Sequence, residues 1–169
     1  MHSARAAQQK NTIYMSENYR IYLDVCCLNR PFDNQSQPRI TQAILSIVSQ
    51  CESGQWKLMT STAIDAELNQ TTNLERLHNV KTILKIAKIR VISSQSLDSR
   101  SRELQRLGFT GYDAAHIASA ERGRADVFLS TDDRLIKRAK RNTQLIRVPV
   151  DNPAPWLIQT TQTEDNDRD

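Results

Sequence analysis

The sequence has no apolar run that approaches the roughly 20 residues of a membrane-spanning helix. Its opening residues, MHSARAAQQKNTIYMSENYR, also lack the apolar segment of a secretory signal peptide. The phosphate-binding pattern GxxxxGK[ST] is absent, which excludes a P-loop nucleotide-binding protein. These absences predict a cytoplasmic protein with no membrane partner.

Cysteine is scarce as well. The chain has three cysteines, Cys26, Cys27 and Cys51, and no CxxC pair. An odd number argues against a disulfide framework, and two adjacent thiols make a poor zinc site without two further ligands. We therefore interpret the cysteines as small apolar residues.

The size and charge fit one domain with a polyanionic partner. A chain of 169 residues is long enough for one hydrophobic core and short for two. The net charge is +4, and residues 163–169 (TEDNDRD) contribute −3, which leaves +7 on the remainder. A basic body suits nucleic acid, although charge of this size would also serve solubility alone.

Short β-rich runs alternate with helical patterns along the chain. This order predicts a doubly wound α/β domain with a central parallel sheet of 4–5 strands and helices on both faces. We expect the domain at residues 20–158, a flexible extension at 1–19 and an acidic, disordered tail at 159–169. The expected strands are 20–24, 56–61, 89–93, 126–130 and 144–150. The expected helices lie near 40–51, 62–68, 74–87, 96–108, 112–122 and 132–141.

Four acidic residues fall where such a sheet binds ligands, outside the carboxyl ends of its strands. Asp24 ends the first strand, Glu67 lies on the helix after the second, Asp113 opens a helix rich in small residues, and Asp132 follows the strand DVFLS. Each alone has an ordinary explanation, such as a helix cap for Asp132 or a favourable first-turn charge for Asp113. Asp24 is harder to explain structurally, because a charge at the end of a buried strand needs a partner.

Carboxylates gathered at one edge need compensation. Two of them about 5 Å apart repel by roughly 3 kcal/mol at an effective dielectric constant of about 20. Mg²⁺ or Mn²⁺ would relieve this repulsion, because both ions prefer oxygen ligands. Such ions can activate water and stabilise the leaving oxygen when a phosphodiester is cleaved.

The ordered set Asp24, Glu67, Asp113 and Asp132 resembles the acidic set of the PIN-domain nucleases. The segments that carry the resemblance are IYLDVCCLNRPFD, STAIDAEL and GYDAAHIASAERGRADVFLSTDDRLIKRA, and together they span about residues 20–150. The resemblance implies that the four acids are both catalytic and metal-binding, with Asn29 and Ser61 as auxiliary residues. It also implies Mg²⁺- or Mn²⁺-dependent cleavage of RNA. Many bacterial members are toxins of the VapC kind that a small antitoxin restrains, and dimers are common.

The chain departs from the family pattern at one position and leaves two others ambiguous. Val25 stands where the family often has Thr or Ser, so a hydroxyl next to the first acid is absent. Asp65 lies two residues before Glu67, on a different helix face, and a shifted register would favour it. Asp133 competes with Asp132 in the same way, as a cap or secondary ligand.

Other residues extend the hypothesis. His116 follows Asp113 by one helical turn and could lie at the metal site, although a histidine there is more often structural. The basic run after Asp132 offers Arg134, Lys137 and Arg138 as contacts for RNA phosphates, with a solvated helix face as the equal alternative. We expect Trp56 and Trp156 to pack in the core or at the chain end, although either could stack on a base.

Two rival classes lack their residues. A haloacid-dehalogenase-like phosphatase needs a second Asp at the position of Cys26, and a receiver domain needs paired acids at the first strand. The alternative that stays open is a catalytically silent PIN-like module that binds RNA or a protein. The expected partners are RNA, an antitoxin and a second copy of the chain.

Overall fold

The computed structural model describes the backbone of residues 18–166 and the side chains of residues 18–162. Within this part, a five-stranded sheet has the order β3-β2-β1-β4-β5, and every pair of neighbouring strands is parallel. The strands are β1 (Arg20–Leu23), β2 (Lys57–Ser61), β3 (Ile89–Val91), β4 (Val127–Leu129) and β5 (Val150–Asp151). The predicted α/β class and parallel sheet are confirmed.

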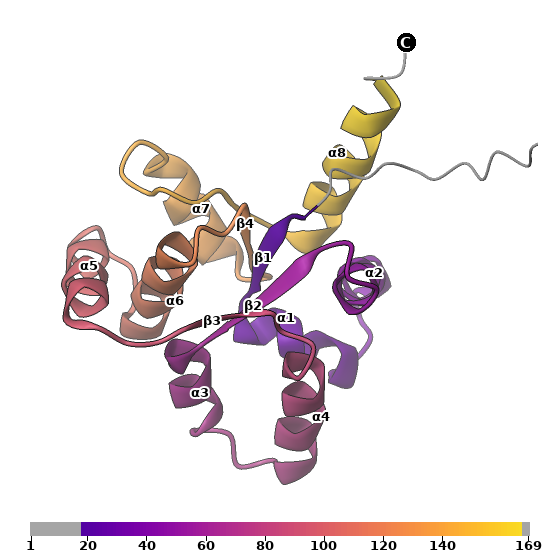
Figure 1. Cartoon of the computed structure of the whole chain (residues 1–169), viewed down its shortest axis with the longest axis horizontal. Coiled ribbons are helices and arrows are strands. Elements are labelled where there is room, and N and C mark those ends of the chain that lie inside the picture. The colour runs from indigo at the N-terminus through magenta and orange to yellow at the C-terminus, as the bar shows by residue number, and fades with distance from the viewer. Residues whose placement is uncertain (1–17, 167–169) are drawn as a thin grey trace, which may run out of the picture.

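Eight α-helices flank this sheet in the described chain. They are α1 (Val25–Asn29), α2 (Pro38–Glu52), α3 (Thr62–Leu68), α4 (Leu74–Leu84), α5 (Gln95–Arg106), α6 (Gly111–Arg122), α7 (Asp133–Arg141) and α8 (Pro153–Asn166), and a short 3₁₀ helix spans Arg30–Phe32. Figure 1 shows α5, α6 and α7 on one side of the sheet and α2 and α8 on the other. The sheet is therefore covered on both faces, as its continuous apolar strands require.

The core is built on the central strand. Ile21, Tyr22 and Leu23 of β1 are fully buried, and Leu129 of β4 lies beside Leu23. Trp56 is also fully buried, and its ring packs edge-on against Tyr19 and Trp156. The prediction that both tryptophans serve packing at the core and the chain end is confirmed.

Both chain ends differ from the sequence-based expectation where the structure describes them. Residues 1–17 of the predicted flexible extension lie outside the described residues, whereas the Asn18 amide donates to the Gln55 carbonyl at 3.0 Å. At the other end, α8 continues to Asn166, so most of the expected disordered tail is helical. Residues 167–169 lie outside the described chain.

One predicted strand was wrong in extent. The strand expected at 144–150 is reduced to Val150–Asp151, because residues 142–148 form turns and bends in which Ile146 and Val148 pack inward. The chain is helical directly after Asp24, first in α1 and then in the 3₁₀ helix. Ser61 caps α3, because its Oγ accepts a hydrogen bond from the Ile64 amide. No helix of the described chain is long and apolar enough to cross a membrane.

Candidate metal centre

Asp24 is held rigidly at the carboxyl end of β1. Leu23 lies opposite Leu129 in the sheet, so that the next residues, Asp24 and Ser130, emerge side by side. The Oδ2 atom of Asp24 accepts a hydrogen bond from Ser130 Oγ at 2.8 Å and from Cys26 Sγ at 3.3 Å. Oδ1 accepts from the Val25 amide at 2.8 Å and thereby caps α1. Asp24 is only 6% exposed, so these donors provide the partner that its buried charge needs.

Ser130 supplies the hydroxyl that position 25 lacks. Its oxygen donates to Asp24 and accepts from the Asp132 amide at 3.1 Å, and the residue is fully buried. One serine therefore fixes the first acid and the backbone of the fourth. The sequence reasoning missed Ser130, although a serine at the end of a buried strand, level with Asp24, was a usable signal.

A second set of contacts runs from Glu67 into the core. His116 Nε2 lies 2.6 Å from Glu67 Oε2, and His116 Nδ1 lies 2.7 Å from the Tyr22 hydroxyl. That hydroxyl lies 2.6 Å from Ser61 Oγ, which also accepts from the Ile64 amide. Four side chains from β1, β2, α3 and α6 thus form one continuous chain of hydrogen bonds.

The protonation of this chain follows from its buried members. Burial, foremost, raises the pKa of Tyr22 far above its usual value, so the phenol stays neutral and can donate. When Nε2–H of His116 donates to the Glu67 carboxylate, Nδ1 is left to accept from the phenol. The Tyr22 oxygen then accepts from Ser61. Tyr22 was another residue that sequence reasoning missed, although a buried tyrosine in a central strand needs a partner for its hydroxyl.

Asp24, Glu67 and His116 form one potential metal site. One ligand atom from each residue lies within 4.8 Å of the other two. A divalent ion about 2.1 Å from each oxygen or nitrogen needs its ligand atoms gathered within about this range. Asp24 and Glu67 would bind the ion through oxygen, and His116 could bind it through Nε2 only in place of its hydrogen bond to Glu67, a mixed set that suits Mn²⁺ more readily than Mg²⁺. The three residues could therefore hold a divalent metal.

Asp113 and Asp132 are close enough to Asp24 for their charges to interact, as the pKa of Asp113 shows. Burial raises the pKa of the Asp113 carboxyl, and the negative charges of Asp24 and Asp132 raise it further. A hydrogen bond with Thr110 and the charge of His116 act in the opposite direction. Asp132 Oδ1 caps α7 by accepting from the amides of Arg134 and Leu135, as its ordinary structural role predicts. Its carboxylate is exposed, so this capping role leaves Oδ2 available.

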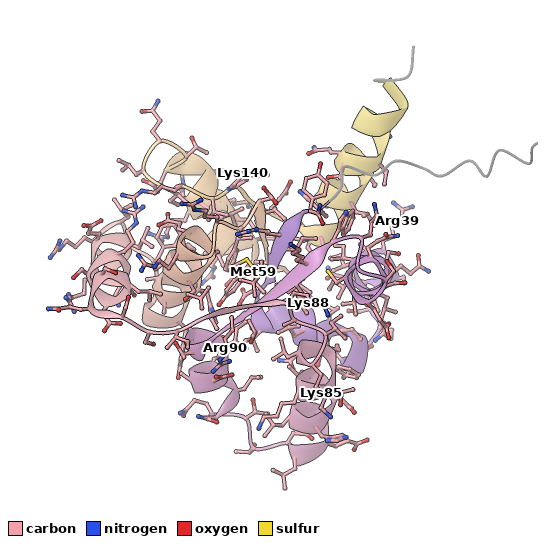
Figure 2. The ribbon with its side chains drawn as sticks, in the orientation of Figure 1. Arg39, Met59, Lys85, Lys88, Arg90 and Lys140 are labelled. Carbon is pink, nitrogen blue, oxygen red and sulfur yellow. The ribbon has the colours of Figure 1, made fainter. Side chains whose placement is uncertain are left out.

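Three further candidate residues, Asp65, Asp133 and Asn29, lie outside the cluster of Asp24, Glu67 and His116. Asp65 forms an ion pair with Arg90 at 2.6 Å (Figure 2 labels Arg90), which favours Glu67 as the acid of this segment. Asp133 is exposed in the first turn of α7. Asn29 is the last residue of α1, and its buried Oδ1 has no hydrogen-bond partner among the described residues. A buried amide oxygen without a donor is a position where a bound ion or water would be expected.

Some basic side chains of α7 are exposed to solvent, and others contact neighbouring parts of the protein. Arg134 and Lys137 are exposed. Arg138 is half-buried, and its guanidinium reaches back over the end of α5, where a Cβ added to Gly108 would lie only 1.9 Å from Nη1. Lys140 Nζ lies 3.4 Å from an Asp151 carboxylate oxygen. Arg134 and Lys137 therefore remain the more accessible of the predicted RNA contacts.

Taken together, the sheet order and these contacts define an α/β protein with a potential metal centre at the carboxyl edge of its sheet. No protein-family profile and no curated protein matches the chain. Among solved structures it is similar to PAE2754 from Pyrobaculum aerophilum, with 15% sequence identity and a TM-score of 0.48. The match covers 86% of this chain and 98% of that one. A likeness at this level says nothing about activity.

Proposed function

We propose that this chain is an endoribonuclease that depends on Mg²⁺ or Mn²⁺, as its resemblance to the PIN-domain family implies. The observation that carries the proposal is the meeting of Asp24, Glu67 and His116 at the carboxyl edge of the sheet. Their sequence separations are large, so only the fold unites them. The raised pKa of Asp113, caused in part by Asp24 and Asp132, supports a set of acids that share one site.

Each residue receives a role from its contacts. Asp24, Glu67 and Asp113 would hold the metal, with Asp132 completing the set from the start of α7. When bound, the metal would lower the pKa of a coordinated water and stabilise the leaving oxygen of the phosphodiester. Ser130 holds Asp24 in place, and His116 donates to one Glu67 oxygen so that the other faces the site. Arg134 and Lys137 would contact RNA phosphates without reading the bases.

A silent RNA- or protein-binding module is the second candidate, and one observation favours it. Glu67 already has a hydrogen-bond partner in His116 Nε2, so this carboxylate is partnered without any metal. The family resemblance also predicts that the chain is a toxin with an antitoxin partner. It predicts homodimer formation as well.

Cleavage of a labelled, mixed-sequence single-stranded RNA tests the proposal. The full chain is assayed in Mn²⁺, in Mg²⁺ and in EDTA, beside Asp24→Asn and Asp113→Asn. We expect cleavage that needs the metal and disappears in both variants, while circular dichroism shows an intact fold. RNA that is bound but never cut would favour the silent module, and wild-type rates in both variants would exclude the assigned site.

A further inference from the structure

A second feature lies at the opposite edge of the sheet, where α6 ends and β4 begins. The Ala125 amide donates to the Ala120 carbonyl at 2.9 Å, and the Arg124 amide donates to the Glu121 carbonyl at 3.0 Å. These two bonds form the helix-ending motif that requires a left-handed residue, usually glycine. Arg124 occupies that position with φ of 56°. A residue with a side chain is disfavoured there, so the choice of arginine needs a reason.

The neighbouring glycine does not take this role. Gly123 has φ of −79°, and a Cβ added to it would lie 2.1 Å from Met59 Cε and 2.9 Å from Val91 Cγ2. Gly123 is thus needed for the close approach of the turn to β2 and β3 (Figure 2 labels Met59). Gly123 therefore stands where close packing requires a glycine. Arg124 stands at the next position, where the left-handed backbone would favour one.

Arginines surround this turn. Arg100, Arg122, Arg124 and Arg147 line a hollow of about 510 Å³ together with Glu121. Arg122 and Arg124 also line an adjoining hollow of about 400 Å³ beside Arg20. The two hollows share these two arginines, so the cationic surface extends across the turn instead of closing around one small ion.

Two carboxylates nearby already accept hydrogen bonds from other groups. Glu121, whose side chain is 4% exposed, accepts from Arg100 Nε at 2.8 Å and Nη2 at 3.0 Å, and from the Arg147 amide at 2.9 Å. Asp126 accepts from the Arg20 amide at 2.7 Å. Among the described residues, no carboxylate forms an ion pair with the guanidinium of Arg122, Arg124 or Arg147. Arg100 is therefore paired with Glu121. The other three arginines have no carboxylate partner among the described residues, so they are available to bind an external anion.

We propose that Arg122, Arg124 and Arg147 form a second contact site for RNA phosphates, which we call the turn site. The choice of RNA as the bound polyanion rests on the proposed function. Guanidinium groups match phosphate oxygens in pairs, and an extended stripe of them suits a chain of phosphates. The residues from Asp113 to Arg122 span about 14 Å of helix axis at roughly 1.5 Å per residue. An RNA strand that crosses this distance over the protein surface would therefore contact the turn site while another part lies at the metal centre.

RNA binding in EDTA tests the turn site separately from cleavage. Fluorescence anisotropy with a fluorescein-labelled single-stranded RNA is measured over a NaCl series, using the full chain. The test variant combines Arg122→Gln, Arg124→Gln and Arg147→Gln. The matched control combines Arg39→Gln, Lys81→Gln and Lys85→Gln, which remove the same charge from exposed positions on the α2 and α4 side (Figure 2 labels Arg39 and Lys85).

We expect the test variant to bind at least about tenfold more weakly than the control variant at about 0.1 M salt. Its plot of log affinity against log salt should be shallower by about 2, since each of the three lost phosphate contacts removes about 0.7 from the slope for a single strand. Equal weakening of both triple variants, or no RNA binding by the wild type, would overturn the turn site. Either result leaves the cleavage assay free to support or exclude the nuclease.

Arg124→Gly separates binding from folding. Glycine suits the left-handed position, so the unfolding midpoint should stay the same or rise by about 2 °C, while RNA affinity falls by about threefold or more. An unchanged affinity in this variant would contradict a role for Arg124 in binding.

Discussion

His116 Nε2 lies 2.6 Å from Glu67 Oε2, and this contact joins a fully buried imidazole on α6 to a one-third exposed carboxylate on α3. The two acids of the segment STAIDAEL therefore have different partners. Glu67 contacts His116 at the centre, whereas Asp65 forms an ion pair with Arg90. The contact with His116 also gives Glu67 Oε2 a buried hydrogen-bond partner. We regard it as the contact that prepares the site for a metal.

Replacing His116 with Phe should weaken metal binding while roughly keeping the packing volume. Glu67 loses its donor, and the Mn²⁺ affinity measured by titration calorimetry should fall about 10- to 100-fold. His78→Phe, at an exposed position of α4, is the control and should bind Mn²⁺ like the wild type. A loss of stability in His116→Phe with unchanged Mn²⁺ affinity would reduce His116 to a packing role.

The Tyr22 hydroxyl should contribute to stability through its two buried partners. Tyr22→Phe leaves His116 Nδ1 and the Ser61 hydroxyl without their shared partner, and the free energy of unfolding should fall by about 1–3 kcal/mol. Tyr112→Phe removes a hydroxyl from a side chain that is 43% exposed and should cost less than about 0.5 kcal/mol. Urea unfolding of both variants measures the difference, and equal values would show that the buried chain of hydrogen bonds adds no stability.

Ser130 should matter for the metal because it holds Asp24. Ser130→Ala removes the donor at 2.8 Å from Asp24 Oδ2 and leaves the Asp132 amide without its acceptor. We expect a 10- to 100-fold lower Mn²⁺ affinity by calorimetry. Ser101→Ala, at another buried position on α5, should leave the affinity unchanged. Similar affinities in the two variants would mean that Asp24 needs no support from Ser130.

The sequence predicted the features that depend on local pattern. Apolar runs such as 20–24 and 126–130 predicted buried parallel strands, and the position of Asp24 at a strand end predicted its place at the edge of the sheet. The choice of Glu67 over Asp65 came from the family pattern, and its contact with His116 agrees with that choice.

The features that the sequence did not predict depend on tertiary position. Tyr22 and His116 are 94 residues apart, and Asp24 and Ser130 are 106 apart, so no local spacing relates them. The short β5 was overestimated because an apolar alternation such as that of residues 144–150 also suits a turn that packs inward. Arg124 gave no local signal, because its left-handed backbone depends on the contact of Gly123 with β2 and β3.

The most direct measurement of the central claim is the initial rate of RNA cleavage in Mn²⁺ by Glu67→Gln and Asp65→Asn. The two variants make the same change in charge two residues apart, on opposite sides of one helix. We predict that Glu67→Gln cleaves at least about 100-fold more slowly than the wild type and that Asp65→Asn stays within about threefold. Wild-type cleavage by Glu67→Gln, or cleavage that persists in EDTA, would contradict a metal centre built on Glu67.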